Sequence, residues 1–258
     1  MTLASLSLDG RVAVVVGGTS GIGLVLARGL AEAGADVVPL ARRREGVESA
    51  AAEVEARGRR TLRLTADVTD RGSLEEARAA VLGAFGRVDV LVNCAACTKG
   101  TPTIDLPEEE WGRILDTNLT GTLRSCQVFG RPMLERGSGR IVNLASLGSF
   151  VALMEVAAYD ASKAGVAALT KSLAIEWGPR GVHVNALAPG VFRTSLNASL
   201  LDGTERGREL VARTPLRRYG RLEELQGACV LLASDAASFI NGEVLAVDGG
   251  FLAAGVLS

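Results

Sequence analysis

Three side chains that can move a proton stand close together in the sequence: Ser146, Tyr159 and Lys163. Tyr159 and Lys163 are four positions apart, so on a helix both side chains project from the same face. An ammonium group beside a phenol stabilises the phenolate and lowers the phenol pKa from its usual value near ~10. The spacing therefore predicts that Tyr159 donates and accepts a proton near neutral pH.

The segment before Ser146 determines where the Ser146 hydroxyl lies. Residues 141–145 form an apolar run typical of a buried strand, and Ser146 ends it. A hydroxyl at the carboxyl end of a strand faces the crevice where open α/β sheets bind ligands. The opposing interpretation is that so short a motif arises by chance, with Tyr159 packed in a core and Lys163 solvated on a helix face.

Strand-like and helix-like segments alternate along the whole chain. Strands are predicted at residues 12–16, 36–41, 62–65, 88–92, 141–145, 182–187 and 243–247, with helices between them, one of which starts at a capping box of Ser73 and Glu76. This alternation predicts an α/β fold, a doubly wound parallel sheet with helices on both faces. Pro39 is awkward in its strand, because proline donates no ladder hydrogen bond. Either the strand frays there or that donor is not needed.

The whole chain, residues 1–258, is predicted to form one domain. Its length and its hydrophobic content of 48% suit a single large core. Residues 192–215 are the one long region without a regular pattern, and a loop of this size in a compact domain is usually a functional lid.

Charge and cysteine content narrow the possible partners and location. A formal net charge of −1 gives no indication of a nucleic-acid or anionic-membrane partner. No stretch approaches the ~20 consecutive apolar residues of a membrane span, and the N-terminus lacks the pattern of a signal peptide. Four cysteines are too few for a disulfide framework in a chain of this size. We therefore expect a cytoplasmic protein.

A glycine-rich turn follows the first predicted strand. Its spacing is G-x-x-x-G-x-G, formed by Gly17, Gly21 and Gly23. Glycines allow a tight turn and let a pyrophosphate approach the N-terminus of the next helix. The spacing is not the common G-x-G-x-x-G fingerprint, and a glycine turn alone can be a merely structural bend. Its place in the first βαβ unit favours dinucleotide binding.

Together these motifs resemble the short-chain dehydrogenase/reductase family over essentially the whole chain. The match continues at Asp67 and Val68 after the third predicted strand, Asn93 after the fourth, Asn118, and Pro189-Gly190 with Thr194. The resemblance implies a nicotinamide-dependent oxidoreductase with a seven-stranded, Rossmann-like parallel sheet. It also implies assembly as a homotetramer.

The resemblance gives each site residue an expected role. Tyr159 would exchange a proton with the substrate oxygen, Ser146 would orient the carbonyl, and Lys163 would hold the nicotinamide ribose. Asn118 would support a water chain to Lys163, although it could instead be a buried polar or helix-capping residue. The residues expected to bind the cofactor are Gly17, Thr19, Ser20, Ile22, Gly23, Arg42, Asp67, Val68, Asn93, Tyr159, Lys163, Pro189, Gly190, Val191 and Thr194.

The end of the second predicted strand favours NADP over NAD. NAD-preferring sites place an acid there to bind the ribose hydroxyls, whereas a 2′-phosphate calls for arginine. Here no acid stands at that position and Arg42 follows the strand directly. NAD is the alternative, in which case Arg42 belongs to a solvated entrance of the next helix.

The substrate is predicted to be a small carbonyl compound or secondary alcohol. Residues 149–154 resemble the corresponding segment of gluconate and deoxygluconate dehydrogenases, which favours a keto sugar acid. Phe150, Leu153 and Met154 would make one wall of the pocket apolar, which leaves a 3-oxoacyl thioester or an apolar ketone open as the substrate. A sensor that binds a dinucleotide without catalysis is a remote alternative, because all the catalytic residue types are present.

Two further residue types invite a metal or redox interpretation. Cys94 and Cys97 form a C-x-x-C, but the sequence has no second such pair and its only histidine is His183. A four-ligand zinc site therefore lacks ligands, and we expect no metal. The two thiols are expected to lie near the cofactor cleft without a defined role, with redox sensitivity as the alternative, and His183 is expected to be structural.

Overall fold

Short runs of β-branched and other apolar residues form one parallel sheet. The computed structural model of the protein describes residues 6–256, so residues 1–5 and 257–258 of the expected domain lie outside the described residues. Within this range six strands are ordered β2-β1-β3-β4-β5-β6. Their bounds are β1 (Val12–Val16), β2 (Asp36–Leu40), β3 (Val90–Asn93), β4 (Gly139–Leu144), β5 (Val182–Pro189) and β6 (Val244–Val247).

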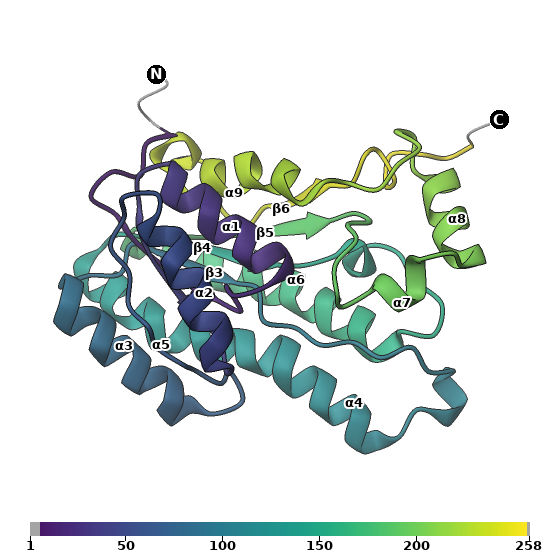
Figure 1. Ribbon diagram of the computed structural model, residues 1–258, viewed down its shortest axis with the longest axis horizontal. Helices are drawn as coiled ribbons and strands as arrows, with labels where there is room; N and C mark the ends of the chain where they lie inside the picture. Colours follow the sequence, from purple (N-terminus) through teal and green to yellow (C-terminus); the bar gives the residue numbers. More distant parts are fainter. Residues whose placement is uncertain (1–5, 257–258) are drawn as a thin grey trace.

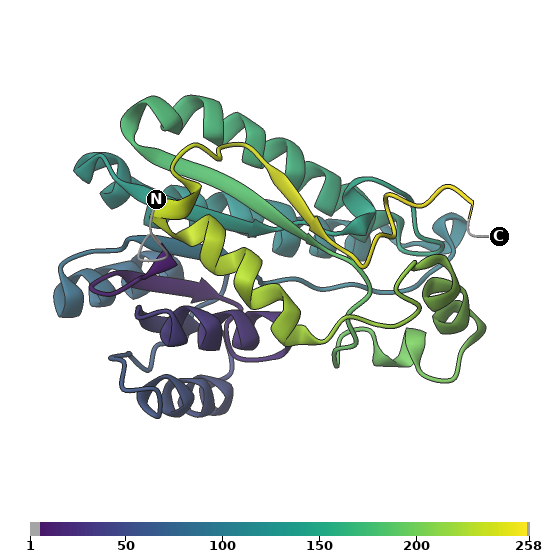
Figure 2. The ribbon, with the colours of Figure 1, turned by 90° about the horizontal axis from the view of Figure 1, so that it is seen from above.

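Helices cover both faces of this sheet, because alternate strand residues point to opposite sides. The longer helices are α1 (Gly21–Glu32), α2 (Arg44–Glu55), α3 (Arg71–Phe85), α4 (Glu108–Leu115), α5 (Gly121–Arg136), α6 (Ala157–Trp177) and α9 (Gln226–Ala233). Val15 belongs to a buried cluster with α1 and α9, whereas Val14 belongs to a second cluster with α3, α5 and α6. Figure 2 shows α1 and α9 on one side of the strands and α6 on the other.

The seventh strand expected at residues 62–65 is absent from the described structure. Its one bridge is an isolated parallel bridge between Thr65 and Ala41, the residue that follows β2. The amide of Val37 donates to the carbonyl of Arg60 at 3.1 Å. The nitrogen of Pro39, two residues further, faces the same side and carries no hydrogen. The hydrogen-bond ladder between β2 and residues 62–65 is interrupted at Pro39. The prediction of seven strands is therefore wrong, and the sheet of the described structure has six.

The start of α3 also differs from the sequence-based expectation. The helix begins at Arg71, and the side chain of Asp70 accepts a hydrogen bond from the amide of Gly72. The hydroxyl of Ser73, expected to cap the helix, instead accepts from the amide of Asp67 at 3.1 Å. Ser73 therefore fixes the loop that follows the bridge at Thr65 rather than the helix start.

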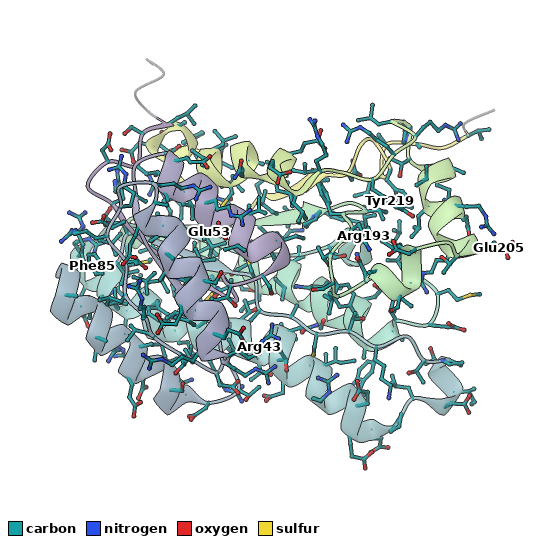
Figure 3. All side chains as sticks on the ribbon, in the orientation of Figure 1. Arg43, Glu53, Phe85, Arg193, Glu205 and Tyr219 are labelled. Atoms are coloured by element: carbon teal, nitrogen blue, oxygen red, sulfur yellow. The ribbon has the colours of Figure 1, made fainter. Side chains whose placement is uncertain are left out.

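The segment at residues 192–215 is not irregular, as the sequence suggested, but contains two helices. They are α7 (Ala198–Leu201) and α8 (Glu205–Arg213). Figure 1 shows both beyond the carboxyl ends of the strands, at the right-hand end of the molecule. Arg193, which lies close to α7 in Figure 3, pairs with Asp202 at 2.7 Å and ties the start of the segment to the end of that helix.

No helix within residues 6–256 is both long enough and apolar enough to cross a membrane. The carboxyl ends of β1, β3, β4 and β5 lead into the loops and helix starts that carry the predicted site residues.

Candidate active site

The strand β4 and the helix α6 bring the three proton-moving side chains together. Ser146 follows β4 and caps a short 3-10 turn, Leu147–Ser149. Tyr159 and Lys163 lie on α6, and the Lys163 Nζ is 5.7 Å from the centre of the Tyr159 ring. Ser146 and Lys163 are buried, and Tyr159 is half-buried. The four-residue spacing thus places the amine beside the phenol, as expected.

Burial, rather than the neighbouring ammonium, dominates the pKa values of this pair. Burial raises the pKa of the Tyr159 phenol, and the hydrogen bond with Ser146 opposes this only in part. Burial likewise lowers the pKa of Lys163 to about 8, although the nearby thiols of Cys94 and Cys97 act against it. Contrary to the expectation, the protein's own groups do not lower the phenol pKa, because desolvation penalises the phenolate more than its neighbours favour it.

The hydroxyl of Ser146 is oriented by its own turn. Its Oγ accepts a hydrogen bond from the amide of Gly148 at 3.2 Å. Because this amide occupies a lone pair of the oxygen, the hydroxyl hydrogen is available for donation. Ser146 can therefore offer a proton donor to an oxygen placed beside Tyr159.

Asn118 lies in a π-helical turn, Asp116–Thr120, between α4 and α5. Its amide side chain is fully buried and accepts from the Cys97 amide at 2.8 Å. The same side chain donates to the Cys97 carbonyl at 2.9 Å and to the Ser162 hydroxyl at 3.0 Å. Asn118 thus holds the loop after β3 against α6. The water chain to Lys163 stays a prediction.

The glycine turn before α1 is closely packed. Gly17 has a φ of +80°, and a Cβ added to it would lie 2.6 Å from the backbone nitrogen of Ala95. A Cβ on Gly23 would lie 2.1 Å from the carbonyl oxygen of Gly17. Neither position can carry a side chain without a backbone shift. The turn is therefore packed against the loop after β3 and against its own backbone, while Gly17, Gly21 and Gly23 line the cleft at the start of α1.

A cleft of about 530 Å³ runs from this turn to Tyr159, a size usual for small-molecule sites. Fourteen of the expected site residues line it: Gly17, Thr19, Ser20, Ile22, Gly23, Arg42, Asp67, Val68, Ser146, Tyr159, Lys163, Pro189, Gly190 and Thr194. The cleft thus joins the glycine turn at the start of α1 to the three side chains expected to carry the reaction.

Three expected residues lie outside the cleft lining. The Asn93 side chain is buried and donates to Asn143 at 2.9 Å, which links β3 to β4 beneath the cleft floor. Val191 lines a smaller neighbouring cavity, and its carbonyl accepts from the amide of Gly220. Asn118 acts through Cys97. These residues support the cleft rather than form its surface.

One end of the cleft is cationic. Arg42 and Arg43 line it, are exposed, and take part in no ion pair with the described residues, whereas Arg44 pairs with Glu48. Arg43 lies at the start of α2 (Figure 3). Burial opposes charge on Asp67, but hydrogen bonds from Thr69 and the charge of Arg42 outweigh it and lower the Asp67 pKa. Arg42 therefore lies near Asp67, and both residues line this end of the cleft.

Sequence reasoning missed several lining residues. Arg43, Thr69, Ala95, Ala96, Thr117, Ser195, Leu196 and Asn197 also face the cleft. Cys94 and Phe192 line it too, the first as a thiol expected near the cleft and the second at the start of the expected lid. Arg43 could have been found, because it closely follows the carboxyl end of a strand. Ser195 to Asn197 carry no such signal, since only the fold of the segment with α7 places them there.

The cysteines and the histidine have no ligand-like arrangement. Cys94 lines the cleft and is a free thiol whose pKa is raised by burial. Cys97 is held through its backbone by Asn118. His183 is the second residue of β5, at the end of the sheet away from the cleft. No group of three potential metal ligands occurs within residues 6–256.

Comparison with known proteins agrees with the fold, the glycine turn and the group of Ser146, Tyr159 and Lys163. The chain belongs to the short-chain dehydrogenase/reductase family. The family profile described as "Enoyl-(Acyl carrier protein) reductase" matches residues 16–252. The protein is accordingly a nicotinamide-dependent oxidoreductase that acts on CH–OH groups.

Named relatives match nearly the full length. Gluconate 5-dehydrogenase of Gluconobacter oxydans is 41% identical over 244 residues, which cover 95% of each chain. D-threitol dehydrogenase of Mycolicibacterium smegmatis is 43% identical over 244 residues, covering 95% of this chain and 94% of that protein. The crystal structure of a gluconate 5-dehydrogenase from Burkholderia cenocepacia in complex with NADP and tartrate superposes with a TM-score of 0.95. It is 38% identical and covers 98% of this chain and 99% of that one.

Proposed function

We propose that Ser146, Tyr159 and Lys163, supported by Asn118, catalyse the NADP(H)-dependent interconversion of a keto sugar acid and its secondary alcohol. The observation that carries this proposal is the convergence of the three side chains at one end of a cleft whose other end is cationic. The names of the gluconate and threitol dehydrogenases support the substrate class. The NADP complex of a relative supports the cofactor.

Each side chain has a task that follows from its surroundings. A bound nicotinamide dinucleotide supplies or accepts the hydride. Because the pKa of Tyr159 is raised, its phenol is protonated near neutral pH and can donate to the oxygen of a carbonyl as negative charge develops there. Ser146 offers the second donor to the same oxygen. Lys163 places a positive charge beside the phenol, and its remaining donors can reach a ribose.

The two directions of the reaction need opposite states of the phenol. Reduction uses protonated Tyr159, whereas oxidation requires the phenol to accept a proton from the alcohol. With a raised phenol pKa, reduction is expected near neutral pH and oxidation is expected to increase toward alkaline pH.

Arg42 and Arg43 are proposed to bind the 2′-phosphate of NADP. Guanidinium groups donate two parallel hydrogen bonds to phosphate oxygens. Neither arginine is engaged by a carboxylate of the described chain, so both are available to a ligand. The remaining cofactor contacts are proposed at the cleft-lining residues named above, with Asn93 and Val191 in support.

An apolar ketone is the second candidate substrate, because of one observation. Phe150 and Met154, on the segment after Ser146, are 50% and 80% exposed. Large exposed apolar side chains on the segment that follows Ser146 favour an apolar substrate group. The segment with α7 and α8 is also proposed to act as a lid over the substrate, since Thr194 to Asn197 line the cleft.

A homotetramer in the cytoplasm is the proposed state of the enzyme. Ile175 and Phe239 are 78% and 103% exposed in the single chain, and large exposed apolar side chains suit subunit contacts. The four free thiols suit a reducing compartment. Light scattering of the purified protein tests the assembly.

The test of function is a substrate panel with variants. Keto sugar acids, 3-oxoacyl thioesters and apolar ketones are assayed with NADPH and with NADH. Tyr159→Phe is expected to lower kcat by ~10²-fold or more while cofactor binding survives. Near-normal turnover by this variant rejects the assignment of Tyr159.

The cofactor assignment has its own variant pair. Arg42→Ala is expected to raise the KM for NADPH by ~10-fold and to leave the KM for NADH unchanged, because only NADPH carries the phosphate. Arg44→Ala is the matched control, since Arg44 is already paired with Glu48. A higher kcat/KM with NADH than with NADPH in the wild type contradicts the proposed phosphate site.

A further inference from the structure

The turn that carries Ser146 is fastened to the catalytic helix by a second serine. The Oγ of Ser149 accepts a hydrogen bond from the backbone amide of Ser146 at 3.3 Å. The same hydroxyl donates to the backbone carbonyl of Lys163 at 2.8 Å. One side chain therefore joins the backbones of two residues that contribute to the reaction, one after β4 and the other on α6.

This bridge fixes the Ser146 hydroxyl from the other side of the turn. The amide of Gly148 holds the Ser146 Oγ at 3.2 Å, and Ser149 holds the Ser146 backbone. A second fastening lies further along the segment, where a carboxylate oxygen of Asp160 accepts from the amide of Leu153 at 2.7 Å. Both fastenings end on α6, so the segment after Ser146 moves with the helix that carries Tyr159.

We propose that Ser149 is a positioning residue that sets the Ser146 hydroxyl against the Tyr159 phenol by joining the turn to α6. The inference rests on the proposed function, because it assumes that Ser146 and Tyr159 act on one substrate oxygen. Ser149 does not itself need to touch the substrate. Its side chain contributes only the hydroxyl, whereas its backbone amide, which donates to the Ser146 carbonyl at 3.0 Å, is kept in any side-chain variant. Removing the hydroxyl therefore breaks the link from the turn to α6 and should loosen the pair.

The expected effect is on the protonation of Tyr159 as well as on rate. The hydrogen bond with Ser146 lowers the pKa of Tyr159 against the effect of burial. Weakening it should raise that pKa, so more alkaline conditions are needed before the phenol can accept a proton. The charged or titratable groups facing this pair are Lys163 and Asp160 on α6, Cys94 and Cys97 after β3, and Arg206 of α8, which faces Asp160. All of them are unchanged when only Ser149 is altered.

The experiment compares pH profiles of alcohol oxidation, with NADP⁺ and the panel alcohol of highest kcat/KM. Ser149→Ala is expected to lower kcat by ~10-fold, because a small misplacement of a reacting group is costly. The midpoint of its kcat profile is expected to move to higher pH by ~0.5 unit or more. NADPH affinity is expected to stay within ~2-fold of the wild type, since Ser149 does not line the cleft.

Two further variants separate positioning from general stability. Ser172→Ala is the matched control, because the Ser172 hydroxyl also donates to a backbone carbonyl of α6, that of Ala168 at 3.3 Å, but on the exposed side. It should leave rate and midpoint unchanged. Ser149→Thr keeps the hydroxyl and should keep the wild-type midpoint. If Ser149→Ala does not fold, Ser149→Cys replaces it, with the same upward shift expected from the weaker hydrogen bonds of a thiol.

The outcomes are distinct. A wild-type midpoint in Ser149→Ala overturns the proposal, even if kcat or thermal stability falls, because a merely structural residue would reduce active enzyme without moving the midpoint. Tyr159→Phe is measured in parallel. If that variant loses turnover while Ser149→Ala keeps the wild-type midpoint, only the role of Ser149 fails. Normal turnover in Tyr159→Phe means that the proposed function itself fails.

Discussion

The Nζ of Lys163 donates a hydrogen bond of 2.6 Å to the carbonyl oxygen of Leu144. Leu144 is the last residue of β4 and lies two positions before Ser146. The bond therefore joins the Lys163 amine on α6 to β4, the strand that leads to Ser146. It also directs one donor of the ammonium to a backbone oxygen. Together with burial, this explains why the amine alone does not make the neighbouring phenol acidic.

The buried amine should make stability depend on pH. The pKa of Lys163 is lowered from 10.5 to about 8 by burial, so between these values the unfolded chain binds more protons than the folded one. Stability should then rise with pH across this window. Relative to Lys163→Met, the wild type should gain on the order of 2 kcal/mol in the free energy of unfolding between about pH 7.5 and pH 10. Urea unfolding at several pH values measures this difference.

Lys171→Met is the control for this prediction. Lys171 lies on the same helix but is exposed, so its removal should leave the pH dependence close to that of the wild type. A constant stability difference between wild type and Lys163→Met over the same window would contradict a desolvated amine at this position.

The glycine turn gives a prediction about cofactor binding. In Gly23→Ala the added Cβ would lie 2.1 Å from the carbonyl oxygen of Gly17, so the turn must shift away from its present path. Affinity for NADPH is expected to fall by ~10-fold or more, because the backbone amides that would meet the pyrophosphate move with the turn. Quenching of protein fluorescence by NADPH measures the affinity.

Gly83→Ala is the control, because it replaces a glycine by alanine without disturbing the glycine turn. Gly83 lies inside α3, and an added Cβ there meets nothing within 4 Å. This variant should bind NADPH normally and be more stable by ~0.5–1 kcal/mol, because alanine favours a helix. Equal affinity in the two glycine variants would show that the turn does not hold the cofactor.

Much of the site could be predicted because its signals are local. The spacing of Tyr159 and Lys163 fixes one helix face, and the glycines after β1 mark a turn that no larger residue can occupy. The ends of apolar runs locate Ser146 and Asp67 at one edge of a parallel sheet. These inferences need only the periods of strands and helices.

Other features depend on the surroundings in three dimensions. The interrupted ladder at Pro39 follows from which side of β2 its nitrogen faces, and this depends on the pairing partner. The raised pKa of Tyr159 depends on burial, which spacing does not reveal. The segment with α8 is so polar that its helical pattern leaves little apolar surface, and only Gly207 of that helix is buried.

The last prediction concerns the hydrogen bonds by which Asn118 holds Cys97 and Ser162, here called the Asn118 clamp. Asn118→Ala removes hydrogen bonds to both backbone groups of Cys97 and to the Ser162 hydroxyl. These groups lie in a buried or half-buried setting, so the free energy of unfolding is expected to fall by about 2 kcal/mol or more.

The matched control and the activity of Asn118→Ala distinguish two roles. Gln127→Ala removes an exposed amide of α5 that accepts from Arg71, and should change stability by less than ~0.5 kcal/mol. Asn118→Ala should also lose ~10-fold in kcat, because the loop after β3 is no longer held against α6. Asn118→Ala could lose turnover and still unfold at the same urea concentration as the wild type. In that case turnover does not depend on the stability that the Asn118 clamp provides. That result would favour the proton-conducting role expected from the family, because proton transfer can fail without loss of packing.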